Sequence, residues 1–137
     1  MIKISHESPL SMLEISRTYN DYDYALVHLF DTNPKYLEFF KESLKQGRKV
    51  LLDNSIFELG EAYDPVQYVK WINELEPTEY IIPDALEDCD KTIRQADDWM
   101  KSKVYHIHGQ SQRIGVVQGM TYGDLVKCYV ALDRMGI

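Results

Sequence analysis

Cysteine is scarce in this chain of 137 residues, which contains only Cys89 and Cys128. Two cysteines without metal-type spacing exclude a disulfide framework, and we expect reduced thiols in the cytoplasm. Long apolar runs are also missing, because stretches such as residues 81–82 and 116–117 fall far short of the ~20 residues that a membrane span needs. Residues 1–7 lack a basic region followed by an apolar stretch, so the sequence shows no signal peptide.

Basic residues are in the minority. The chain has 15 Lys and Arg against 22 Asp and Glu, a formal net charge of −7, which argues against indiscriminate nucleic-acid binding. Glycine-rich phosphate loops of the Gly-x-Gly-x-x-Gly or Walker type are absent too, and this excludes a nucleotide-binding Rossmann or P-loop protein. The length suits one domain.

Apolar segments of strand character alternate with amphipathic segments of helical spacing. Five strands are predicted, at residues 2–5, 24–30, 50–52, 79–83 and 113–118. Helix starts follow them at Ser8-Pro9, Asn33-Pro34, Asp64-Pro65, either Asp88 or Asp90, and Thr121. Residues 104–108 alternate like a half-buried strand, but residues 113–118 are the better candidate for a central strand.

This order predicts an α/β fold with a parallel sheet covered by helices. Right-handed crossovers leave two architectures, an open doubly wound sheet or part of a (β/α) barrel. Five units in this length make roughly 27 residues a unit, and a complete eight-unit barrel takes ~250 residues. We therefore expect residues 1–137 to form one partial, TIM-barrel-like domain of about five βα units, truncated at its C-terminus.

Polar residues directly follow three of the predicted strands. They are Asp53, Asp84 and Gln118, and the carboxyl ends of parallel strands are where such folds hold their chemistry. Two carboxylates and an amide suit the donor and acceptor edge of a heterocycle, and one carboxylate suits proton transfer. A purely structural interpretation is equally open, since Asp after a strand often makes an Asx turn or caps the next helix.

A histidine pair offers a second chemistry. His106 and His108 are alternate residues, as in the metal pairs of barrel hydrolases, and Asp84 would complete the set. The alternative is a surface loop without a metal.

The strand ends resemble those of tRNA-guanine transglycosylases and their phage and bacterial DNA-modifying relatives, which insert 7-deazaguanines. Residues 53–58 read Asp-Asn-Ser-Ile-Phe-Glu, where that family has Asp-Ser-Gly-Gly-Phe-Gln. Residues 115–120 read Gly-Val-Val-Gln-Gly-Met, followed by Tyr-Gly-Asp-Leu at 122–125, where the family has Gly-Ile-Val-Gln-Gly-Gly and then Tyr-x-Asp-Leu. The strand between them ends in Ile-Ile-Pro-Asp at residues 81–84.

The resemblance implies a role for each matched residue. Asp53 would be the acid/base near the ribose, Phe57 would stack on the base, and Asp84 with Gln118 and Gly119 would bind the purine edge. Ser55 and Ile56 depart from the pattern, because they replace two glycines of the family's loop.

The family's nucleophilic aspartate and its zinc site have no counterpart in these residues, so we expect no cofactor in this chain and no activity from it alone. The expected partners are a purine or 7-deazapurine base, with tRNA or DNA bound through the intact parent protein, and no membrane. A non-catalytic half-barrel that assembles into homo-oligomers through exposed sheet edges is the alternative function.

Overall fold

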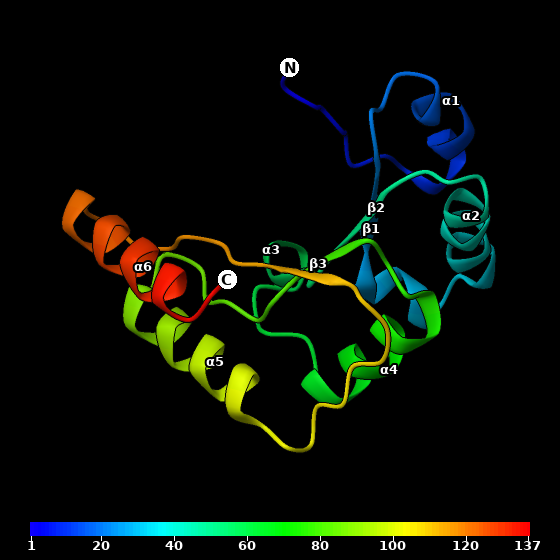
Figure 1. Cartoon of the computed structure of the whole chain (residues 1–137). Helices are drawn as coiled ribbons and strands as arrows, with labels where there is room; N and C mark the ends of the chain where they lie inside the picture. Colours follow the sequence, from blue (N-terminus) through cyan, green and yellow to red (C-terminus); the bar gives the residue numbers. More distant parts are fainter.

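The computed structural model describes residues 1–137 and shows a mixed α/β chain with four strands and six helices (Figure 1). The strands are β1 (Asp23–Leu26), β2 (Val50–Asp53), β3 (Glu79–Ile81) and β4 (Gln112–Ile114). The helices are α1 (Leu13–Arg17), α2 (Pro34–Lys45), α3 (Ile56–Leu59), α4 (Pro65–Leu75), α5 (Cys89–Lys101) and α6 (Tyr122–Arg134). Two 3₁₀ turns, at Leu10–Met12 and Val27–Asp31, precede α1 and follow β1.

Local capping explains where the long helices begin. The Asp64 side chain accepts a hydrogen bond of 2.7 Å from the backbone N–H of Gln67, and Pro65 occupies the first turn of α4. Asp88 caps α5 in the same way. At α6, Thr121 and Asp124 form a capping box, because each accepts from the other's backbone N–H.

The prediction of five βα units is wrong by one unit. Residues 2–5 do not form a strand, although the carbonyl of Ile4 accepts a backbone hydrogen bond of 2.9 Å from Asp21. The N–H of Ile4 donates instead to the Asp21 side chain, at 2.7 Å, so no regular ladder develops.

Two further strands are shorter than predicted, since the strand expected at residues 113–118 is β4 and ends at Ile114. The strand expected at residues 24–30 ends at Leu26, whose N–H donates to the Tyr36 hydroxyl at 2.9 Å, and a 3₁₀ turn follows. The preference for a strand at 113–118 over one at 104–108 is confirmed, because residues 104–108 form a loop in which Asn73 bonds the backbone of both His106 and His108. A side-chain amide there takes the place of a neighbouring strand.

The four strands are all parallel and lie in sequence order, β1-β2-β3-β4. Right-handed crossovers between consecutive neighbours place the connecting helices on one face of a sheet. Figure 1 shows this arrangement, with α2, α4, α5 and α6 around the outer side of the sheet and the other side open. In a doubly wound sheet the strand order reverses direction at a switch point. The order of these four strands contains no such reversal.

The hydrophobic core lies between the sheet and these helices. Val50, Leu52 and Tyr80 point into it from the strands and are at most 2% exposed. Phe40 of α2 and Ile72 of α4 meet them from the helices. Each such side chain contributes about 1.5–3 kcal/mol on burial, so this layer holds the carboxyl ends of the strands in position. None of the helices combines the length and the apolar character that crossing a membrane requires.

Candidate functional site

The centre of the candidate site is the carboxylate of Asp84, three residues beyond the end of β3. Its Oδ1 accepts a hydrogen bond of 2.7 Å from Nδ2 of Asn54, and its Oδ2 accepts one of 2.7 Å from Nε2 of Gln118. Asp84 is only 2% exposed. The structure therefore joins the ends of β2, β3 and β4 through one buried carboxylate.

The Gln118 amide is held at both ends. While its Nε2 donates to Asp84, its Oε1 accepts from the backbone N–H of Glu87 at 3.0 Å. The Glu87 backbone is left-handed, with φ of 59°. These two bonds orient the amide so that its donor side faces the carboxylate.

Asn54 is the site residue that the sequence reasoning did not single out. It is 4% exposed, and Nδ2 also donates to the carbonyl of Ile82 at 2.9 Å. Its Oδ1 accepts from the N–H of Ile56 at 3.1 Å, an Asx turn that begins the loop after β2. The signal was its place directly after Asp53, since a buried amide there can tie two neighbouring strands together.

Burial sets the protonation behaviour of Asp84. Removal from water raises the pKa of its carboxyl above the usual 3.8, and the charge of Asp53 adds to this increase. Hydrogen bonds from Asn54 and Gln118 act in the opposite direction, because they stabilise the charged form. The net result is a carboxyl that takes up a proton more readily than an exposed aspartate.

Asp53 lies at the end of β2 and is half-buried. Its Oδ2 accepts from the Tyr24 hydroxyl at 2.5 Å, and its Oδ1 accepts from the N–H of Ser55 at 2.6 Å. The pKa of Asp53 is raised, with burial as the largest cause, while these two hydrogen bonds act to lower it. The nearby charge of Glu58 raises it and that of His28 lowers it. A half-buried carboxyl with a raised pKa is suited to giving and taking a proton.

Phe57 and Gly119 occupy very different surroundings. Phe57 lies on the short helix α3 with 80% of its surface exposed. Gly119 comes directly after Gln118 and packs against the start of α6. A Cβ added at this residue would overlap the Cβ of Asp124. The structure thus brings together Asp84 and Gln118, keeps Asp53 on the adjacent strand end, and leaves the Phe57 ring in solvent.

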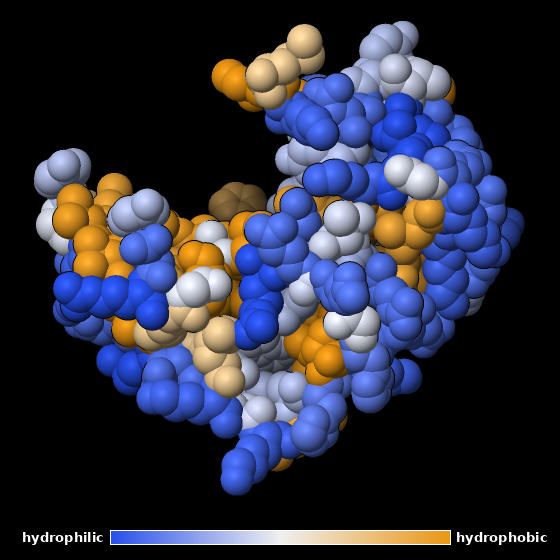
Figure 2. Space-filling view, viewed as in Figure 1, coloured by the Kyte–Doolittle hydropathy of each residue, from blue (hydrophilic) through white to orange (hydrophobic).

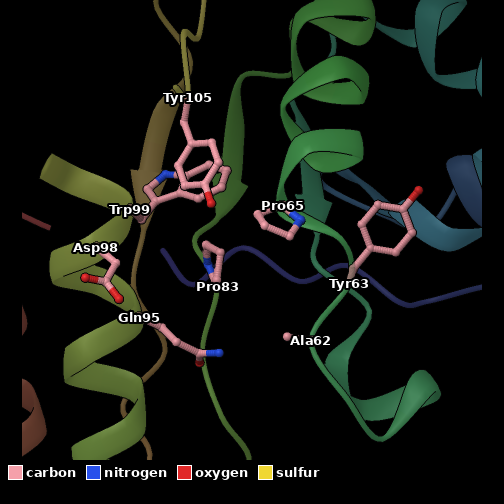
Figure 3. A pocket seen from close by; sticks show the side chains of 8 residues that line it. All are labelled: Ala62, Tyr63, Pro65, Pro83, Gln95, Asp98, Trp99 and Tyr105. Atoms are coloured by element: carbon pink, nitrogen blue, oxygen red, sulfur yellow. The ribbon is translucent and has the colours of Figure 1, made fainter. Parts of the chain in front are cut away.

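Two cavities of different size lie near the hydrogen bonds of Asp84. A cavity of about 10 Å³ touches Asn54 and Asp84, which is too small for a purine. A cavity of about 180 Å³ begins at Pro83 and lies against α5 (Figure 3).

The histidine pair does not meet a third ligand. The structure contains no group of three or more His, Cys, Asp or Glu side chains placed to hold a metal ion. His106 and His108 lie instead in the loop whose backbone Asn73 bonds.

Searches against protein-family models, curated proteins and solved structures find no significant match.

Proposed function

We propose that the strand ends of this chain form the base-recognition part of a guanine or 7-deazaguanine transglycosylase-type (β/α) barrel. The observation that carries the proposal is the hydrogen bond of 2.7 Å between Gln118 and Asp84, with Asp53 on the neighbouring strand end. A carboxylate that accepts from N–H groups and an amide that donates to a carbonyl oxygen complement the edge of guanine.

The topology supports a barrel rather than an open doubly wound sheet. Consecutive strands of a (β/α) barrel are parallel neighbours in sequence order with the long connecting helices outside, which is the arrangement of β1 to β4 with α2, α4 and α5 (Figure 1). Four units correspond to half of the eight in a complete barrel. The three polar strand ends would then lie at its carboxyl-terminal mouth.

The backbone of Ser55 supports the alignment with the transglycosylase motif. Ser55 has φ of 60° and ψ of 24°, the left-handed region that favours glycine, and it stands where that family has glycine. The local conformation therefore fits the family's loop even though the side chain differs. Gly119 matches the second motif for another reason, since its place against Asp124 excludes any side chain.

The residues divide the work of base exchange as follows. Asp53 holds and moves a proton, and the Tyr24 hydroxyl orients its carboxylate. Asp84 and Gln118 exchange their mutual hydrogen bond for bonds to the base, and the exposed Phe57 ring covers one face of the base. The covalent glycosyl-enzyme step needs a carboxylate nucleophile that the matched motifs do not include, so this chain supplies recognition and proton transfer.

A binding titration tests this proposal. We expect the 7-deazaguanine base preQ0 to bind the chain saturably in isothermal titration calorimetry. Gln118→Ala should weaken binding about tenfold, which corresponds to one or two lost hydrogen bonds. Asp133→Asn, an exposed carboxylate on α6, serves as the matched control and should bind like the wild type. The proposal fails if preQ0 gives no saturable heat, or if Gln118→Ala leaves the affinity unchanged while circular dichroism shows both proteins folded.

An assembly role is the second candidate, and one surface favours it. The helix α6 exposes Tyr122 (83%), Tyr129 (60%) and Val126 (44%), and Figure 2 shows apolar residues in orange over this helix, at the left. Beside it, β4 pairs with β3 on one side only and leaves an open strand edge. An apolar face next to an open edge suits a second copy of this chain.

Solution mass measurements decide this second candidate. We expect a dimer in multi-angle light scattering, and Tyr129→Glu should convert it to a monomer. Arg134→Gln, at an exposed residue at the end of the same helix, also changes the net charge by −1 and should leave the mass unchanged. A wild-type monomer at high protein concentration contradicts the assembly role and leaves the base-binding proposal untouched.

A further inference from the structure

A second cavity, outside the strand-end network, has both the shape and the chemistry of a ligand site. It has a volume of about 180 Å³ and lies between the start of α4 and the middle of α5 (Figure 3). Pro65, Pro83, Trp99 and Tyr105 supply its apolar walls. For comparison, a cavity of roughly 150 Å³ is enough to hold benzene, so this one admits a single six-membered ring with a small substituent.

The aromatic walls pack against each other and against the core. Trp99 is 5% exposed and packs against Tyr68 and Tyr80, and the Tyr105 ring lies on it with centroids 4.9 Å apart and planes 30° apart. Pro65 is fixed at the first turn of α4 by the Asp64 cap. A preformed apolar slot loses little conformational entropy when a ring enters it.

Two side chains of α5 that line this slot, the half-buried Gln95 and the exposed Asp98, carry acceptors without partners. The Oε1 atom of Gln95 is buried and has no hydrogen-bond partner, although such atoms are nearly always paired in folded proteins. One turn further along, the Asp98 carboxylate makes no ion pair or side-chain hydrogen bond, while the neighbouring Asp97 pairs with Lys101 at 2.7 Å. Figure 3 shows the Gln95 amide and the Asp98 carboxylate projecting from the same helix toward the cavity.

The chemistry of the lining indicates what kind of ligand would fit. The apolar walls suit a flat ring, and the Gln95 and Asp98 acceptors suit a group that donates hydrogen bonds. We infer that this cavity binds a small organic cation, a single ring that carries an N–H-bearing cationic group such as an amidine. The ring fills the space between the prolines and the aromatic pair. The cationic group donates one hydrogen bond to Gln95 Oε1 and a charge-assisted one to Asp98. The chain's net charge of −7 favours the approach of a cation.

The test uses the full chain and benzamidine as the probe, with neutral benzamide as a probe of the same shape. In a titration followed by the nuclear magnetic resonance signal of the Trp99 indole, benzamidine should bind saturably with a dissociation constant of about 1 mM or below. Benzamide should bind about fivefold more weakly, because it lacks the charge. Asp98→Asn should reduce benzamidine binding to the level of benzamide.

Two further variants separate the site from general electrostatics and from unfolding. Asp97→Asn removes a carboxylate from the same helix outside the cavity, and benzamidine should bind it like the wild type. Gln95→Leu removes the unpaired acceptor, so it should weaken binding about fivefold while the thermal midpoint stays the same or rises. The inference is overturned by a linear, non-saturating shift of the Trp99 signal, or by equal weakening in Asp97→Asn and Asp98→Asn. Neither result bears on preQ0 binding at Asp84.

Discussion

The Gln118 amide donates a hydrogen bond of 2.7 Å to the Asp84 carboxylate, across the ends of two neighbouring parallel strands. Each residue has a second partner that holds it in place, Asn54 for Asp84 and the Glu87 backbone for Gln118. A buried carboxylate whose two oxygens are both satisfied is stable in the unliganded chain. It can recognise a base only by exchanging one of these donors for the ligand.

Removing the Gln118 amide should destabilise the fold as well as weaken base binding. Gln118→Leu leaves one oxygen of a buried carboxylate without a donor, which costs about 1–3 kcal/mol of unfolding free energy. Urea unfolding measures the loss. Gln110→Leu, in an exposed loop and without side-chain hydrogen bonds, is the matched control and should change the free energy by less than about 0.5 kcal/mol. Equal values for the two variants would show that the Asp84 contact contributes nothing to stability.

Asp53 should give the chain a distinctive pH dependence. Burial raises the pKa of Asp53 in the folded state above the usual 3.8, so the folded chain holds this proton more strongly than the unfolded chain. The free energy of unfolding contributed by this group therefore falls as pH rises from 3.8 through the raised pKa. Asp53→Asn cannot titrate, and its amide can still accept from Ser55 and donate to the Tyr24 oxygen.

The pH effect is measured by urea unfolding between about pH 4 and pH 7. The variant should lose less stability than the wild type over this range, and at pH 7 it should be at least as stable. Asp133→Asn, an exposed carboxylate, should keep the wild-type slope. A steeper slope in Asp53→Asn than in the wild type would contradict the raised pKa.

The left-handed backbone of Ser55 makes a specific prediction about side-chain size. Ser55→Gly relieves a strained φ of 60° but loses the long hydroxyl contact of 3.4 Å with the His28 N–H, so stability should stay within about 1 kcal/mol of the wild type. Ser55→Val places a β-branched side chain in the same conformation at a fully buried position and should destabilise by about 3 kcal/mol or more. Thermal unfolding compares the two, and a well-folded Val variant would exclude the left-handed conformation.

Two glycines near the start of α6 should respond to alanine in opposite directions. Gly119→Ala forces a Cβ onto Asp124, which should destabilise by about 1–3 kcal/mol. Gly123→Ala, inside the helix and with no contact closer than 3.8 Å, should stabilise by about 0.5–1 kcal/mol. Differential scanning calorimetry of the pair tests the prediction, since identical shifts would mean that residue 119 has room for a side chain.

The start expected at Ser8-Pro9 is a 3₁₀ turn at Leu10–Met12 without a side-chain cap, and α1 begins only at Leu13. The other helix starts were predictable because their causes are local. Asp64, Asp88 and Thr121 each cap a helix through a backbone N–H three residues away, and this contact needs no distant part of the chain. Strand ends were not predictable in this way. Residues 2–5 have strand character but lack a regular ladder, because the Asp21 side chain takes the place of a backbone acceptor.

In the candidate site, too, some features depend on local sequence and others on contacts between distant residues. The sequence by itself determined that Asp53, Asp84 and Gln118 follow apolar strands, and parallel pairing places such positions at one edge of a sheet. Only the tertiary structure decided that Asp84 is buried, that Gln118 and the unforeseen Asn54 satisfy it, and that Phe57 lies in solvent. These outcomes depend on distances between side chains 30 or more residues apart, and packing of the whole chain sets them.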